Sequence, residues 1–270
     1  MTLPPAARGP TEVFGPLAED YALFRPSYPG ELFDALHSRL GSRFGRTLDL
    51  GSGTGAAVLP LLERGARVVA LEPNRFMLAR AHQRLRAREG WVGAVAARAE
   101  SLPIASGVAS CITVAQAFHW FEPKPALAEI ARVLRPRGML VLLWNVTVPD
   151  AFTDEVRDLI GRYNPGYGRP VTSSMLGTPE ALARHDAFEV EPPAEFVHER
   201  PMTEDAYVGY AFSWSYCGGA LTSAARGPFE DELRQAVRRH HPGGEWSERL
   251  IAVAHFARRS GAEAGSVVDG

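Results

Sequence analysis

Residues 47–56 read TLDLGSGTGA, and they set the architecture of the chain. A short apolar run ends at Leu50, three glycines follow at every second position, and the pattern AAVLPLLERG over 56–65 is helical. Such a run predicts a buried strand, and closely spaced glycines predict a tight turn whose backbone can approach a ligand. The stretch therefore predicts a strand, a glycine turn and a helix in direct succession.

Strands and helices continue to alternate downstream of this unit. Strand-like runs and helical patterns follow each other at 67–73, 74–89, 91–103, 108–118, 125–134 and 139–146. Asn74 is placed to cap the helix expected at 74–89. Such alternation is typical of a mostly parallel sheet with helices on both faces. We predict an α/β, Rossmann-like fold with a mostly parallel seven-stranded sheet and a helical insertion before the last strand.

The length of 270 residues suits one α/β domain with an elaboration. We predict a single domain over 17–260, between a disordered leader (1–16) and a disordered tail (261–270). Its expected parts are a helical cover, a cofactor-binding core and a C-terminal part, at 17–41, 42–148 and 149–260. In the last part, one strand near 188–200 and a final strand at 249–259 flank inserted helices over about 203–241, and insertions of this length often cover a site.

The composition excludes several classes of function. The formal net charge of −2 leaves no excess of Lys and Arg to neutralise phosphates, so nucleic acid is not an expected partner. No apolar run approaches the roughly 20 residues that span a bilayer, so no membrane association is expected. Cys111 and Cys217 lie apart without a nearby cluster of His or Cys, which predicts neither a disulfide framework nor a metal site. A reducing, cytoplasmic location fits these features.

The glycine turn fits two adenosine-containing cofactors. Gly51, Gly53 and Ala56 match the dinucleotide pattern GxGxxA, but the same residues also read GxGxG. Asp49 favours S-adenosylmethionine, because a carboxylate would repel a pyrophosphate and attract the cationic sulfonium and amino groups. Glu72 ends the next strand, where an acid can accept hydrogen bonds from the ribose of either cofactor, or can instead cap the following helix.

Five stretches resemble the class I S-adenosylmethionine-dependent methyltransferases, in their type 11 branch. They are LDLGSGTG, VVALEPNRFMLARA, ARAESLP, VAQAFHWF and EIARVLRPRGMLVLLWN, at 48–55, 68–81, 97–103, 114–121 and 129–145. YALFRPSYP, AQAFHWFE and AFSWSY, at 21–29, 115–122 and 211–216, are similar to the group that includes trans-aconitate methyltransferases. The resemblance implies a methyltransferase that uses S-adenosylmethionine on a small molecule and is a monomer or a homodimer.

The resemblance also implies roles for individual positions. Asp49, Gly51, Gly53 and Gln116 would approach the methionine portion, Glu72 the ribose, Pro73 and Met77 the adenine edge, and Ala99 with Glu100 the exocyclic amine, with Ser52 also in the cofactor turn. Many relatives carry an acid where this chain has Ala99, so the adenine contact would fall to the backbone or to Glu100. Arg25, whose planar fork suits a carboxylate, would pair with the methionine carboxylate or with an acidic substrate.

Methyl transfer from a sulfonium is an in-line displacement, so few side chains need to react. His119 follows the fourth strand and is the candidate general base for a hydroxyl or carbon-acid acceptor, although it could instead pack beside Trp120. Trp120 is selected from the aromatic run 118–121 as a substrate contact, and the other expected substrate contacts are Tyr21, Tyr28, Ser213 and Tyr216. O-methylation of a carboxylate or hydroxyl is the expected reaction.

Three other functions stay open. A non-catalytic protein of the same fold would bind the cofactor or a partner without transferring a methyl group. An NAD-dependent oxidoreductase is disfavoured by Asp49 beside the glycine turn. A methyltransferase of nucleic acid or protein is disfavoured because the strand end AQAF lacks the Asn-Pro-Pro-aromatic pattern and the chain has no basic face.

Overall fold

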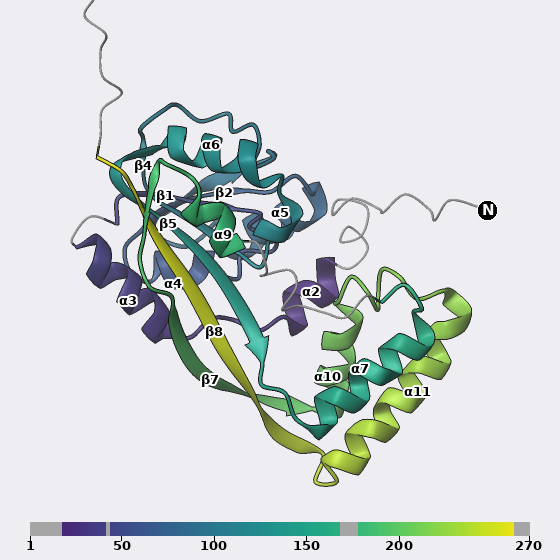
Figure 1. Ribbon diagram of the computed structural model, residues 1–270. Helices are drawn as coiled ribbons and strands as arrows, with labels where there is room; N and C mark the ends of the chain where they lie inside the picture. The colour runs from purple at the N-terminus through teal and green to yellow at the C-terminus, as the bar shows by residue number, and fades with distance from the viewer. Residues whose placement is uncertain (1–17, 42–43, 168–177, 262–270) are drawn as a thin grey trace, which may run out of the picture.

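The structure is a computed structural model that describes residues 18–41, 44–167 and 178–261 (Figure 1). The expected leader (1–16) lies outside these residues, as does the expected tail except for Gly261. The strands are β1 (Arg46–Leu50), β2 (Arg67–Leu71), β3 (Trp91–Val95), β4 (Ala109–Ala115), β5 (Leu134–Thr147), β6 (Phe188–Val190), β7 (Ala194–Thr203) and β8 (Glu245–Arg259).

These strands form one sheet, with the order β3-β2-β1-β4-β5-β8-β6 along its main path. The pairs from β3 to β5 are parallel, and β8 is antiparallel to its neighbours. β7 pairs with the first part of β8 and β6 with its last part, so both lie along one edge of that strand. The strand order reverses between β1 and β4, the place where open α/β sheets bind ligands.

Helices cover both faces of the sheet. α3 (Gly30–Leu40), α4 (Val58–Leu62) and α5 (Arg75–Leu85) pack their apolar side chains on one face, and α6 (Pro123–Val133) with α9 (Thr178–Ala183) on the other. Asn74 caps α5 as predicted, because its side chain accepts hydrogen bonds from the backbone N–H groups of Phe76 and Met77. This cap fixes the start of α5 directly after the end of β2.

The remaining long helices form a separate hydrophobic cluster. α7 (Ala151–Tyr163), α10 (Glu204–Phe212) and α11 (Ser223–His240) pack together beyond the sheet, at the end of the long strands β5, β7 and β8 (Figure 1). The short helix α2 (Ala18–Phe24) lies against α10, where a Cβ on Gly209 would come within 2.4 Å of the Phe24 ring. α2 therefore joins the inserted helices to α5, which packs on the sheet.

The predicted fold class is confirmed, and one detail differs. The stretch near 188–200 forms two strands in place of one, because Pro192 and Pro193 have no N–H to donate and separate β6 from β7. The inserted helices α10 and α11 lie between β7 and β8, as expected. Among the described residues, no helix has the length and apolar character needed to cross a bilayer.

Candidate active site

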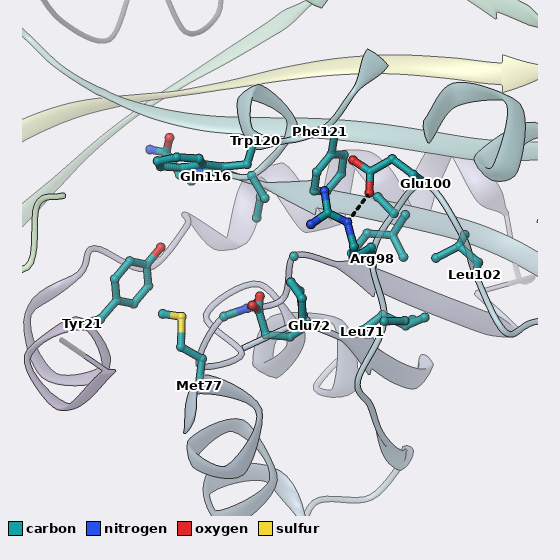
Figure 2. Close-up of a pocket in the computed structure, with 18 residues that line it drawn as sticks. Tyr21, Leu71, Glu72, Met77, Arg98, Glu100, Leu102, Gln116, Trp120 and Phe121 are labelled. Atoms are coloured by element: carbon teal, nitrogen blue, oxygen red, sulfur yellow. Dashed lines mark hydrogen bonds and ion pairs between the residues drawn. The ribbon is translucent and has the colours of Figure 1, made fainter. Parts of the chain in front are cut away.

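A pocket lies at the carboxyl ends of β1, β2 and β4, where the strand order reverses (Figure 2). It contains about 720 Å³ of space between atoms, part of it open to solvent. Ten predicted site residues line it: Tyr21, Gly51, Gly53, Glu72, Pro73, Met77, Ala99, Glu100, Gln116 and Trp120. Nine of these residues come from four segments that follow β1, β2, β3 and β4 at one edge of the parallel sheet, and Tyr21 comes from α2.

The glycine turn after β1 forms the floor of this pocket. Gly51 and Gly53 have φ angles of +62° and +54°, in the left-handed region that favours glycine. A Cβ on Gly51 would lie 2.5 Å from the Cβ of Ala117, so glycine at this position lets the end of β4 approach the turn. At Gly53 the nearest atoms to such a Cβ are the pocket side chains of Met77 and Tyr21, at 3.6 and 3.7 Å.

Glu72 connects the glycine turn to the start of α5. Its Oε2 accepts a hydrogen bond from the backbone N of Gly53 at 3.0 Å, and its Oε1 accepts one from the backbone N of Asn74 at 2.9 Å. Burial raises the pKa of this carboxyl above its ordinary value, and the two hydrogen bonds oppose that rise. A carboxylate oxygen has more than one lone pair, so Glu72 can hold both segments and still accept hydrogen bonds from a ligand in the pocket.

Asp49 lies behind the turn and does not line the pocket. Its side chain is 1% exposed, and the Thr113 hydroxyl donates a hydrogen bond of 2.6 Å to its Oδ1. Burial raises the pKa of Asp49 to about 7, with a smaller contribution from the charge of Glu72. The carboxyl group therefore changes charge near neutral pH.

The end of the pocket that lies away from Tyr21, here called the far end, carries a pair of charged side chains (Figure 2). Arg98 lies 3.4 Å from Glu100 through Nε and Oε2, and Glu100 Oε1 accepts a hydrogen bond from the backbone N of Glu122 at 2.9 Å (Figure 2). Apolar side chains that the sequence did not identify complete this end, chiefly Leu71, Leu102 and Phe121. Phe121 belongs to the aromatic run from which only Trp120 had been selected, so the sequence did contain a signal for it.

The predicted residues Arg25, Tyr28, His119 and Tyr216 gather outside the lining of this pocket. The Arg25 charge acts on the pKa of His119, Tyr28 and Tyr216, which places these three groups near its guanidinium. The Arg25 side chain also lies over the ring of Tyr21, with 4.7 Å from Cζ to the ring centre. Its Nε is buried without a hydrogen-bond partner in the part of the chain that the structure describes. This cluster is therefore a cationic neighbour of the pocket.

His119 is next to Trp120, with 5.2 Å between the ring centres. Loss of hydration, and to a smaller extent the Arg25 charge, lowers the pKa of His119 to about 4, although part of its side chain is exposed to solvent. An unshifted histidine, with a pKa of about 6.5, would already be mostly neutral above pH 7. The ring is therefore in its proton-accepting form at neutral pH.

Two predicted serines lie away from the pocket lining. Ser213 is fully buried, its hydroxyl donates to the backbone O of Tyr210 at 2.6 Å, and its own backbone O accepts a hydrogen bond of 3.0 Å from Arg25. Ser52 is buried in the glycine turn, and its hydroxyl has no partner among the residues that the structure describes. Ser213 thus connects α10 to the end of α2 through its backbone.

Comparison with known proteins agrees with this geometry. Residues 48–142 match the model of a family described as a methyltransferase domain. The chain is 36% identical over 230 residues to an uncharacterized methyltransferase of Mycobacterium tuberculosis, a match that covers 84% of this chain and 86% of that protein. It is 31% identical over 246 residues to a protein of Dictyostelium discoideum named as a methyltransferase, covering 89% and 90% of the two chains.

A solved structure has the same fold. It comes from Anaeromyxobacter dehalogenans, is assigned as a type II methyltransferase, and is 28% identical to this chain with a TM-score of 0.62. The match covers 88% of this chain and 98% of that one. The chain therefore belongs to the class I S-adenosylmethionine-dependent methyltransferases.

Proposed function

We propose that this protein transfers the methyl group of S-adenosylmethionine to an oxygen atom of a small molecule, either a carboxylate or a hydroxyl. The observation that supports the proposal is that the two ends of the pocket have different linings. Apolar side chains and the Arg98–Glu100 pair line one end, which suits a nucleoside with its apolar base faces and polar edges. Tyr21, Gln116 and Trp120 line the other end (Figure 2). Tyr21 connects that second end to Arg25, so a cofactor and an acidic molecule can lie side by side.

In this proposal each part of the cofactor has its own contacts. The ribose lies at Glu72, which keeps free lone pairs, and the methionine portion lies at the glycine turn and Gln116. Asp49 behind the turn attracts the cationic amino and sulfonium groups. The remaining cofactor contacts are Ser52 in the turn, Pro73 and Met77 at the adenine edge, and Ala99 with Glu100 at the exocyclic amine.

The acceptor is proposed to enter beside Arg25, beneath the inserted helices. S-adenosylmethionine, when bound, supplies an electrophilic methyl group, so the protein has to align the acceptor oxygen with it. Arg25 would hold a carboxylate of the acceptor or of the methionine portion, because a guanidinium binds carboxylates in a bidentate manner. His119 would accept the proton of a hydroxyl acceptor, and Tyr28, Trp120, Ser213 and Tyr216 would surround the acceptor.

The similarity of 21–29, 115–122 and 211–216 to trans-aconitate methyltransferases supports a small acid as the acceptor. The absence of a net positive charge supports a small molecule over nucleic acid.

Calorimetric titration with S-adenosylmethionine, S-adenosylhomocysteine and NAD tests the cofactor. We expect the first two to bind and NAD not to bind. Glu72→Ala is expected to lose both ligands, while the matched control Glu63→Ala, which changes an exposed residue at the end of α4, is expected to keep them. Binding of NAD without S-adenosylmethionine would contradict the proposal.

Formation of S-adenosylhomocysteine with a panel of small carboxylic acids, alcohols, phenols and amines tests the acceptor. We expect turnover with an oxygen acceptor. Turnover with amines alone would contradict O-methylation, and cofactor binding without turnover on any of them would favour a non-catalytic role.

A further inference from the structure

Gln116 is held in an unusual conformation beside the pocket. Its φ angle of +53° lies in the left-handed region, which residues other than glycine rarely adopt. Its backbone N donates a hydrogen bond to Leu143 O, and its side-chain Nε2 donates one to the backbone O of Asn145, each at 2.9 Å. The orientation of the Gln116 amide therefore depends on where Asn145 lies.

Asn145, near the end of β5, is a buried junction between three parts of the chain. Its side-chain Nδ2 donates a hydrogen bond to the backbone O of Ser27 at 3.0 Å, in the turn between α2 and α3. Its Oδ1 lies 3.0 Å from Nε2 of His198, on β7. The end of β4 thus meets Asn145 at its backbone oxygen, while the turn of the N-terminal cover and the C-terminal strand β7 meet it at its side-chain amide.

The chemistry of the partners determines which atom donates at each contact. A backbone carbonyl such as Ser27 O can only accept, so the Asn145 amide must present its NH₂ group there and its oxygen to His198. That oxygen can only accept, so Nε2 of His198 must carry a proton. The contact is therefore a directed hydrogen bond that holds the Asn145 side chain in one of its two amide orientations.

A small residue on β8 lies between the two strands that make this contact. Ala252 pairs with Asn145 on β5 and with Phe196 on β7, so β8 lies between the two strands that carry the polar partners. The methyl group of Ala252 is fully buried. The sheet thus brings together residues 53 positions apart in the sequence.

We propose that Asn145 and His198 are positioning residues that keep the Gln116 amide and the Ser27 turn in the arrangement required for cofactor binding. The inference rests on the proposed use of the pocket for S-adenosylmethionine. No residue of β7, the strand that carries His198, lines the cofactor pocket. His198 would therefore act on the pocket through its contact with Asn145. Neither residue touches the reacting atoms.

The test compares three variants by calorimetric titration with S-adenosylhomocysteine and by thermal unfolding without ligand. His198→Leu removes the donor, and His198→Gln restores an N–H group near the position of Nε2. His255→Leu is the control, because it removes a buried histidine on β8 whose ring packs against Trp144. We expect at least a fivefold increase in Kd for His198→Leu, and values within twofold of the unaltered protein for the other two.

The outcomes separate positioning from packing. Unchanged affinity in His198→Leu, or equal losses in His198→Gln or His255→Leu, would overturn the inference while leaving the proposed function intact. No binding by the unaltered protein would overturn both. Should His198→Leu fail to fold, Asn145→Asp tests the same junction, because it keeps the volume and loses the donor to Ser27. We expect Asn145→Asp also to bind at least fivefold more weakly, and unchanged affinity would overturn the inference.

Discussion

Asp49→Asn is expected to stabilise the protein while weakening the cofactor site. The pKa of Asp49 is raised from 3.8 to about 7, so the folded protein binds this proton more tightly than the unfolded chain does. Stability from this group is therefore fully present below pH 4, falls as the pH rises from about 4 to about 7, and stays low above that range. Asn has no charge to bury and can still accept the hydrogen bond from Thr113.

The magnitude follows from the size of the shift. A change of roughly three pKa units, at about 1.4 kcal/mol each, corresponds to at most about 4 kcal/mol of unfolding free energy at pH 8. Under the proposed function the same carboxylate attracts the cationic methionine end through space, and such an attraction contributes about 1.5–3 kcal/mol at a separation of roughly 6–10 Å and an effective dielectric constant of about 20. The affinity for S-adenosylmethionine at pH 8 is therefore expected to fall by about 10- to 100-fold.

Urea unfolding at pH 6 and pH 8, with calorimetric titration of S-adenosylmethionine at pH 8, measures both effects. The difference in stability between Asp49→Asn and the parent is expected to be larger at pH 8 than at pH 6, because other titrating groups contribute equally to both proteins. Asp34→Asn is the control, since it neutralises an exposed carboxylate that pairs with Arg64 and whose pKa is lowered. Equal pH dependence in Asp49→Asn and the parent would refute the reasoning, as would lower stability of the variant at pH 8.

Three further substitutions test the packing and the chemistry. Gly51→Ala is expected to cost about 1–3 kcal/mol more than Gly41→Ala by urea unfolding, because both have positive φ but only the first meets the end of β4; equal costs would contradict this. Gly209→Ala is expected to lower the thermal midpoint, since its Cβ meets α2, whereas Gly161→Ala, in open space on α7, is expected to raise it; a rise in both would show that α2 does not pack closely there. His119→Gln is expected to reduce turnover of a hydroxyl acceptor by about 10²-fold or more without changing cofactor affinity, and unchanged turnover would exclude it as the base.

The parts of the site that follow one strand could be predicted from the sequence. Gly51, Gly53 and Glu72 each lie directly after a buried apolar run, and the parallel sheet brings such positions to one edge. The cap at Asn74 is equally local, because it depends only on the next three residues. These predictions needed the order of the elements along the chain and no knowledge of distant contacts.

The parts that depend on distant contacts could not be predicted. The hydrogen bond from Arg25 to Ser213 joins residues 188 positions apart, and no local pattern identifies such a pair. The pairing of Arg98 with Glu100 at the far end of the pocket depends on the course of the loop after β3. The low pKa of His119 has the same origin, because it depends on the burial of the ring and on the position of Arg25 in the folded protein.

α7 and the inserted helices α10 and α11 have a hydrophobic cluster that shares no buried residue with the two clusters of the sheet. Substitutions inside the insertion therefore alter its packing and leave the core around the glycine turn as it is. Under the proposed function, substitutions in these helices can therefore reshape the surface above the acceptor without altering the cofactor site. Divergence among homologues is expected to concentrate in α7, α10 and α11, and exchanging these helices between relatives offers a route to new acceptor preferences.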